Sequence, residues 1–182
     1  MNPLQPALAL LLGTAVALAD TPSLEAEAWE LSSRFMARLK PELQSAMADG
    51  GPAHAIEICA SQAPQIADAL SAESGWLVRR VSLKQRNASR AVPDDWERKV
   101  LEDFDQRQAA GEEAASLVHA ETVGGNFRYL RAQAVAPVCL VCHGEQRSPD
   151  IEATLKTFYP DDIAVGYSLG QVRGAISLSK PL

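Results

Sequence analysis

Residues 115–135 read ASLVHAETVGGNFRYLRAQAV and have the pattern of two strands joined by a tight turn. The two runs, 115–123 and 127–135, flank Gly124-Gly125-Asn126. Gly and Asn tolerate the positive φ angles that tight turns between paired strands need. The stretch therefore predicts a β-hairpin, and with it an antiparallel sheet.

Two further segments are predicted to be strands. Residues 76–83 are rich in Leu and Val around two arginines, and residues 171–179 form the last strand. Between the first strand and the hairpin, Asp94 and Glu97 have the spacing of a capping box at the start of a helix. Strands in hairpin order, with helices in front and between, predict an α+β domain built on an antiparallel sheet.

The segment before the strands is predicted to be helical. Pro41 lies inside the first helical pattern, so a kink or break is expected near Lys40. Gly50-Gly51 ends this helix, and Pro52 suits the first turn of a second helix, which Pro64 ends or bends. One face of the first helix is marked by apolar residues that recur every three or four positions: Leu24, Ala28, Leu31, Phe35, Leu39, Leu43 and Met47.

Composition excludes several classes of protein. The chain has 182 residues, enough to bury a sizeable core, and 47% of them are hydrophobic, which argues against disorder. There are 17 Lys and Arg against 23 Asp and Glu, a formal net charge of −6 without a basic cluster. Such a chain is a poor nucleic-acid binder, so no nucleic-acid partner is expected. Three cysteines are too few for a disulfide framework.

The N-terminus has the pattern of an export signal. Leu8–Ala19 is an apolar run too short to span a bilayer, and it ends in Ala17-Leu18-Ala19, a small-x-small cleavage signal. The run lacks Lys and Arg before it, and the alternative is a buried N-terminal helix. We predict a signal peptide at residues 1–19 and one domain at 20–182. With no later stretch able to span a membrane and no transmitter domain, a soluble periplasmic protein is expected.

Cys139-Leu140-Val141-Cys142-His143 is a CxxCH motif. Two thiols at this spacing can form thioether bonds to the vinyl groups of a haem, and the adjacent His can ligate its iron. A thioredoxin-like CxxC should follow a strand and open a helix, whereas this one follows Pro137 in a late loop. A zinc site needs further ligands, and the remaining Cys and His lie far apart in the sequence. A plain disulfide leaves His143 unexplained. The motif therefore favours one covalently bound haem c.

Cys59 is the thiol that the motif leaves over. It lies on the apolar face of the second predicted helix, where a free Cys is usually a small buried hydrophobe. The sharper hypothesis makes Cys59 the second axial iron ligand. Ligand chemistry alone ranks His or Met higher for this role, which leaves His54, His119, Met36 and Met47 as rivals.

Four stretches of the chain resemble a known family, the exported c-type haem domains of PAS-like fold that occur alone or as the sensor part of bacterial signalling proteins. One departure is that Arg86-Asn87 is followed by Ala88-Ser89-Arg90, where family members commonly have Pro and a further Asn. The resemblance spans about residues 25–180 and rests on four stretches: Ala55–Cys59 with Ala63-Pro64, Val78–Ser82 with Arg86-Asn87, Cys139–Gly144, and Tyr159–Asp162 with Gly166-Tyr167 and Gly170–Ile176.

The resemblance implies a PAS-like antiparallel sheet with N-terminal and flanking helices. It also implies that the Cys of the first stretch is the distal iron ligand, so that Cys59 and His143 would be the metal ligands. The two haem propionates need cationic or hydrogen-bonding partners, and the candidates are Arg79, Arg80, Arg86 and Tyr159.

Three functions are compatible with such a haem. The first is a redox or diatomic-gas sensor module that signals to a separate protein. The second is a low-potential electron-transfer cytochrome c with a redox partner. The third is a haem enzyme, which is least favoured because no acid–base pair for the open iron position is visible in the sequence. We therefore predict a protein that is not an enzyme.

Overall fold

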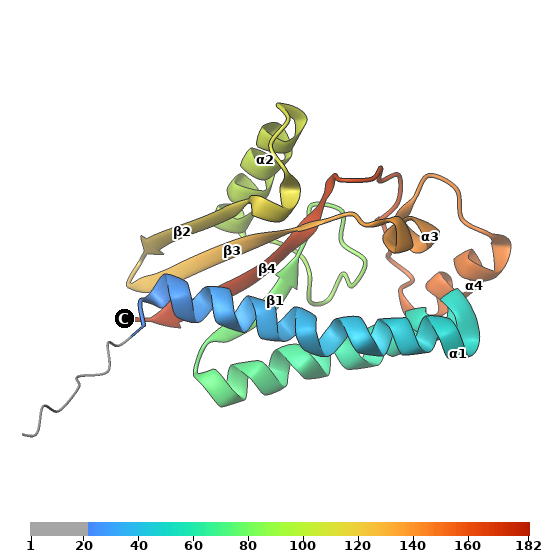
Figure 1. Ribbon diagram of the computed structural model, residues 1–182, viewed down its shortest axis with the longest axis horizontal. Coiled ribbons are helices and arrows are strands. Elements are labelled where there is room, and N and C mark those ends of the chain that lie inside the picture. Colours follow the sequence, from blue (N-terminus) through green and yellow to red (C-terminus); the bar gives the residue numbers. More distant parts are fainter. Residues whose placement is uncertain (1–21) are drawn as a thin grey trace, which may run out of the picture.

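The computed structural model describes residues 22–182, which form a four-stranded antiparallel sheet with helices on both faces (Figure 1). The predicted signal peptide lies outside the described residues. The strand order is β1-β4-β3-β2, and the α+β fold class with its antiparallel sheet is confirmed. The strands are β1 (Leu77–Val81), β2 (Val118–Val123), β3 (Asn126–Ala134) and β4 (Val172–Pro181).

The predicted hairpin is present. Val123 of β2 pairs with Asn126 of β3, and the intervening Gly124 and Gly125 both have positive φ. The first strand of this hairpin, β2, starts later than expected, because the preceding residues form the 3-10 turn η1 (Ala114–Ser116). β3 then pairs along its whole length with β4, so β3 and β4 form the centre of the sheet, with β2 and β1 at its edges.

The helix α1 (Leu24–Ser74) is a pair of antiparallel arms that reverse at Gly51 (Figure 1). Gly51 has φ 70° and ψ −163°, a conformation that glycine adopts without strain. Glu73 near the end of the second arm binds Arg34 at 2.6 Å and Arg38 at 2.9 Å on the first. The predicted break near Lys40 is wrong. Pro41 is exposed, so the backbone groups that it leaves unpaired can meet water, and the helix continues.

The remaining helices are α2 (Asp95–Ala109), η2 (Pro137–Cys139), α3 (Leu140–His143) and α4 (Pro149–Phe158). The capping box predicted for α2 is confirmed, with the Asp94 side chain accepting from Glu97 N–H at 2.8 Å and the Glu97 side chain accepting from Asp94 N–H at 2.8 Å. Within residues 22–182, no helix combines the length and the apolarity needed to cross a membrane.

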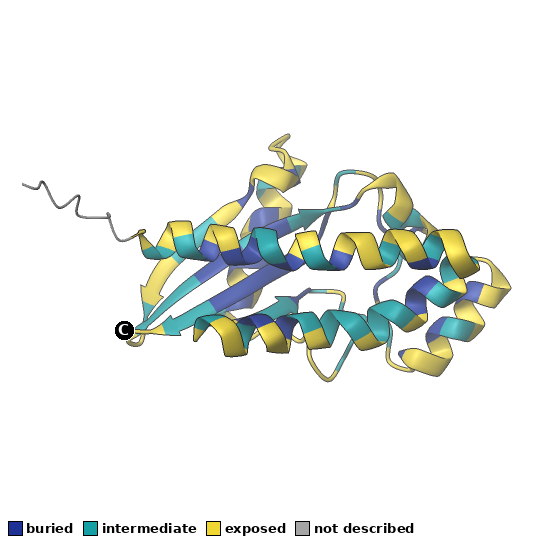
Figure 2. Ribbon diagram, turned by 60° about the horizontal axis from the view of Figure 1, so that its bottom comes forward, coloured by how far each residue is buried: buried dark blue, intermediate teal, exposed yellow. Residues whose placement is uncertain are grey.

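The sheet has a hydrophobic core on each face. One lies under the arms of α1 and includes Phe35, Leu70 and Trp76, and the other lies under α2 and includes Leu101 and Phe104. Figure 2 shows the buried residues along the central strands and on the helix faces that meet them. The CxxCH segment, α4 and the turn of α1 gather at the end of the sheet away from the β2–β3 turn (Figure 1).

A β-bulge shapes this end of the sheet. Gln133 pairs with Gly174 and Ala134 pairs with Val172, so Arg173 has no partner across the ladder. Gly174 has φ 149°, and a Cβ there would overlap the backbone oxygen of Val81. The bulge therefore depends on glycine, and it places Arg173 beside the CxxCH segment.

Candidate functional site

The two thiols of the CxxCH motif are held by apolar neighbours. Cys139 at the end of η2 packs against a small cluster that contains Val135 and Tyr167. Cys142 in α3 packs against another cluster that contains Ile151 and Tyr159. Among residues 22–182, Cys59, Cys139 and Cys142 are all free thiols. The motif is thus anchored on both sides while its sulfur atoms stay available for bonding.

The ring of His143 has a defined orientation. Its Nδ1 lies 2.9 Å from the backbone oxygen of Ala164, and since a carbonyl oxygen only accepts, Nδ1 carries the hydrogen. This leaves the lone pair on Nε2, the form in which imidazole binds a metal. Burial lowers the pKa of His143 to about 2, and the positive charges of Arg173 and Arg86 act in the same direction. His143 is therefore neutral at physiological pH.

Arg173 lies directly against this ring. Its Nε is 3.1 Å from Nδ1 and 3.3 Å from Nε2 of His143, and its Nη1 donates to Ser82 Oγ at 2.9 Å and to the Lys84 backbone oxygen at 3.2 Å. The guanidinium also lies 5.3 Å from the centre of the Tyr167 ring. Arg173 is only 8% exposed, and burial lowers its pKa to about 10. Arg173 was not among the residues predicted for the site, although it lies within the Gly170–Ile176 stretch that carries the resemblance.

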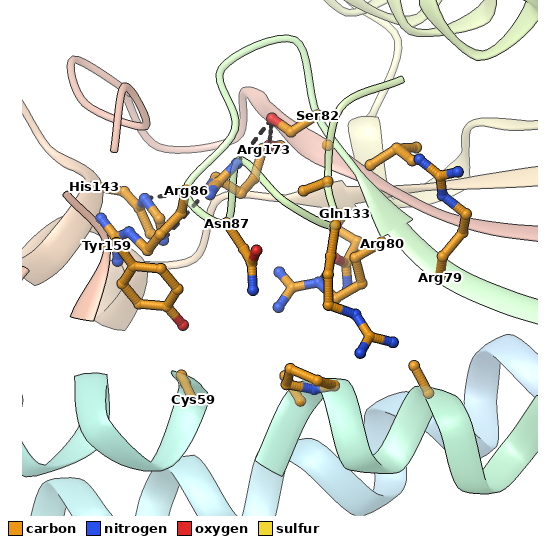
Figure 3. Close-up of a pocket in the computed structure, with 17 residues that line it drawn as sticks. Cys59, Arg79, Arg80, Ser82, Arg86, Asn87, Gln133, His143, Tyr159 and Arg173 are labelled. Carbon is orange, nitrogen blue, oxygen red and sulfur yellow. Dashed lines mark hydrogen bonds between the residues drawn. The ribbon is translucent and has the colours of Figure 1, made fainter. Parts of the chain in front are cut away.

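One cavity brings together most of the predicted site residues. Cys59 extends into it from the second arm of α1, and His143, Tyr159 and Arg86 line it from the segments above that helix (Figure 3). Arg80 of β1 completes this group, whereas the side chain of Arg79, the preceding residue on the strand, points away from Cys59. The apolar part of the lining comes from Ala63, Pro64, Ala67, Val81, Ala91 and Gly174.

Cys59 is half-buried on its helix. Burial raises the pKa of the Cys59 thiol above its ordinary value, while the positive charges of Arg80 and Arg86 lower it by less. Without a stronger cation beside it, this thiol is neutral at pH 7. Tyr159 is in a similar position, because burial raises its pKa to about 12.

The Tll0287-like family matches residues 13–181, nearly the whole chain. The chain belongs to this family. Among solved structures, it is similar to the crystal structure of the cyanobacterial haem protein Tll0287, with a TM-score of 0.61 and 25% identity. That match covers 85% of this chain and 89% of the other. No curated protein matches the sequence.

The rival ligands lie elsewhere in this Tll0287-like chain, since none of the four lines the cavity. His54 lies 3.5 Å from Glu57 on the surface of α1. His119 on β2 lies 3.5 Å from Glu121, with its ring against Trp96. Of the described side chains, no group of three or more His, Cys, Asp or Glu is placed to bind a metal ion.

The predicted arginines differ in their partners. Arg79 donates to the Val92 backbone oxygen at 2.6 Å and lies 3.6 Å from the buried carboxylate of Glu97. Arg86 donates to the Cys142 backbone oxygen at 2.5 Å and lies 3.3 Å from Asp162. Arg86 thereby ties the CxxCH segment to the loop after β1.

Proposed function

We propose that this chain is an exported, periplasmic c-type haem protein that acts as a redox or diatomic-gas sensor module. One haem would be attached through Cys139 and Cys142, and His143 and Cys59 would bind its iron. The observation that carries the proposal is that Cys59 and His143, far apart in the sequence, line one cavity beside the CxxCH motif. The similarity to a haem protein of the same family supports it.

The residues around the cavity fit this group. His143 is neutral, its Nε2 carries the lone pair and has the Nε of Arg173 as its neighbour at 3.3 Å, and the two motif thiols precede it in the chain. A thiol from α1 faces the same space, and guanidinium groups line it, among them the buried one of Arg173. Imidazole and thiolate are both established axial ligands of haem iron, and guanidinium groups are the usual partners of haem carboxylates.

Bound haem supplies one-electron chemistry and, when one iron position is open, a site for a small diatomic gas. The two residues that would bind the iron are held differently in the protein. His143 is tethered next to Cys142 and fixed by the hydrogen bond to Ala164, whereas Cys59 reaches the site from a separate element. Burial raises the pKa of the Cys59 thiol, so Cys59 would favour its protonated form when it is not bound to a metal. Cys59 would therefore be the ligand that is released, and α1 the element that reports its release.

A low-potential electron-transfer role is the second candidate. Val138 and Val141, beside the motif cysteines, are 46% and 37% exposed. Exposed apolar side chains next to the attachment site offer a contact surface for a redox partner. In this alternative both iron ligands stay bound in both oxidation states. Neither role needs a catalytic residue.

Production of the full chain in a bacterium with a c-type haem attachment system tests the proposal. Intact mass spectrometry should give one added haem on a chain that starts at Asp20. A Cys139→Ala, Cys142→Ala double variant should lose the haem from a denaturing gel. A haem that acid and organic solvent extract from the wild type would contradict covalent attachment.

A further inference from the structure

Five arginines line the cavity, and their positive charges are not equally balanced. Three of them have a carboxylate partner. Arg79 lies 3.6 Å from Glu97, Arg86 lies 3.3 Å from Asp162, and Arg90 binds Asp68. Each of these three guanidinium groups thus has a carboxylate within ion-pair distance.

Arg80 and Arg173 differ from the other three. Arg80 is half-buried on β1, and its Nε donates to the side-chain oxygen of Gln133 at 3.0 Å. Arg173 is 8% exposed and donates to neutral acceptors, the Ser82 hydroxyl and the Lys84 backbone oxygen. Within residues 22–182, neither guanidinium has a carboxylate within ion-pair distance.

Asp162 cannot serve as their counter-charge, although it lies at the same end of the cavity. Its carboxylate already binds Arg86 at 3.3 Å and Arg147 at 3.1 Å, and its Oδ1 accepts from the Ala164 backbone N–H at 2.9 Å. One negative charge is therefore shared by two guanidinium groups. The surroundings of Arg80 and Arg173 stay positive.

A buried cation without a counter-ion is costly, and a fold keeps it where an anion binds. Two cations without a carboxylate partner, the buried Arg173 and the half-buried Arg80, line one cavity here, and a haem carries two carboxylates. We propose that Arg80 and Arg173 bind the two propionates of the haem, one each. This assignment rests on the proposed haem function. The assignment narrows the set of residues predicted to bind the propionates, since Arg79 and Arg86 already have carboxylate partners. It also adds Arg173 to that set.

The bulge in β4 explains how Arg173 reaches this position. In a regular strand, residue 173 would pair with a residue of β3 and its side chain would lie on one face of the sheet. The bulge instead leaves Arg173 unpaired at the rim of the cavity. Gly174 allows the close approach of β1 that the bulge requires. Arg80 projects from β1, the neighbour of β4, so adjacent strands supply both cations.

The test uses infrared difference spectra of the oxidised and reduced holoprotein, with haem isotopically labelled at its two carboxyl carbons. Arg80→Gln and Arg173→Gln should each shift a labelled carboxylate band. Arg90→Gln is the matched control, since Arg90 lines the same cavity but is paired with Asp68. Its spectrum should equal that of the wild type.

The reduction potential gives a second readout. Loss of a positive charge next to a propionate favours ferric iron, so each Gln variant should raise the ferric-to-ferrous ratio about tenfold at a fixed applied potential, which equals a fall of about 60 mV. Arg80→Lys and Arg173→Lys keep the charge and should restore most of the ratio. If a Gln variant fails to fold, the corresponding Lys variant can be measured in its place.

Results that contradict the propionate assignment can be distinguished from results that contradict the proposed haem function. Haem-loaded wild type whose labelled bands are unchanged in both the Arg80 and Arg173 variants contradicts the assignment alone. Bands that move in Arg90→Gln instead would also overturn it. A wild-type chain that takes up no haem would overturn the proposed function and this assignment together.

Discussion

The backbone oxygen of Ala164 accepts a hydrogen bond of 2.9 Å from Nδ1 of His143. Ala164 is itself held in place, because its N–H donates to Asp162 Oδ1 at 2.9 Å. Asp162 in turn binds Arg86, which donates to the backbone oxygen of Cys142. The orientation of the imidazole is thus fixed by a closed set of contacts around the CxxCH segment.

Asp162→Asn should weaken the fold at this point. The substitution removes the charge that balances Arg86 and Arg147, whose side chains are 12% and 16% exposed. Loss of one partner from a buried ion pair costs about 3 kcal/mol, which urea denaturation of the holoprotein would measure. Asp161→Asn is the matched control, because Asp161 is the exposed neighbour. Equal stability of the two variants would show that Asp162 has no such role.

Gly174→Ala should destabilise the protein more than Gly125→Ala. Both glycines have positive φ, but a Cβ at 174 would overlap the Val81 oxygen whereas a Cβ at 125 meets open space. We expect Gly174→Ala to cost about 1–3 kcal/mol beyond the control, because the backbone must shift. Thermal unfolding would measure the difference. Similar melting temperatures for the two variants would be the contrary result.

The cap of α2 should give an acid-dependent stability. Partial burial alone would raise the pKa of Asp94, but hydrogen bonds from Arg128 and the Glu97 backbone outweigh it and hold the pKa below its usual value. A carboxyl group with a lowered folded pKa stabilises the fold above its unfolded pKa, and this contribution is lost as pH falls through the folded value. Wild type should therefore lose more stability below about pH 4 than Asp94→Asn does.

Denaturant unfolding across the acid range would check this prediction. Asp95→Asn removes the same formal charge one residue along, on the exposed first turn of α2. Its pH profile should follow that of the wild type. An Asp94→Asn profile parallel to both would show that the Asp94 charge is not involved.

Reduction should weaken the proposed bond between Cys59 and the haem iron. A thiolate is stabilised by ferric charge, and a buried thiol whose pKa is raised prefers its protonated form when that charge falls. The ferrous protein should therefore bind carbon monoxide more readily than a bis-histidine haem, and more so as pH falls. Optical titration of the ferrous protein with carbon monoxide at each pH would measure this binding. A ferrous form that keeps both ligands and refuses carbon monoxide from neutral to mildly acidic pH would favour the electron carrier.

Local signals in the sequence predicted much of the fold. Gly124-Gly125-Asn126 set the hairpin, and the spacing of Asp94 and Glu97 located the start of α2, since turns and caps depend on neighbouring residues. The helix break predicted from Pro41 was wrong, because the sequence alone does not show that the surroundings of this proline are exposed. Whether a helix tolerates proline depends on what surrounds it.

The site depended on contacts between distant segments. The CxxCH motif is local and was visible, but the place of Arg173 follows from a bulge that exists only when β3 pairs with β4. Arg79 and Arg80 are neighbours in one strand, so their side chains point to opposite faces, and one reaches Glu97 while the other reaches Gln133. No pattern in the sequence indicates which of the two has a carboxylate partner.

The electron paramagnetic resonance spectrum of the ferric holoprotein tests the pairing of Cys59 with His143 most directly. Wild type should give the low-spin spectrum of thiolate and imidazole ligands, and Cys59→Ser should lose it while the haem stays covalently attached. Ser61→Ala, on the same arm of α1, is the control and should leave the spectrum unchanged. A thiolate spectrum absent from the wild type, or unchanged in Cys59→Ser, would contradict the account and return the ligand to His54, His119, Met36 or Met47.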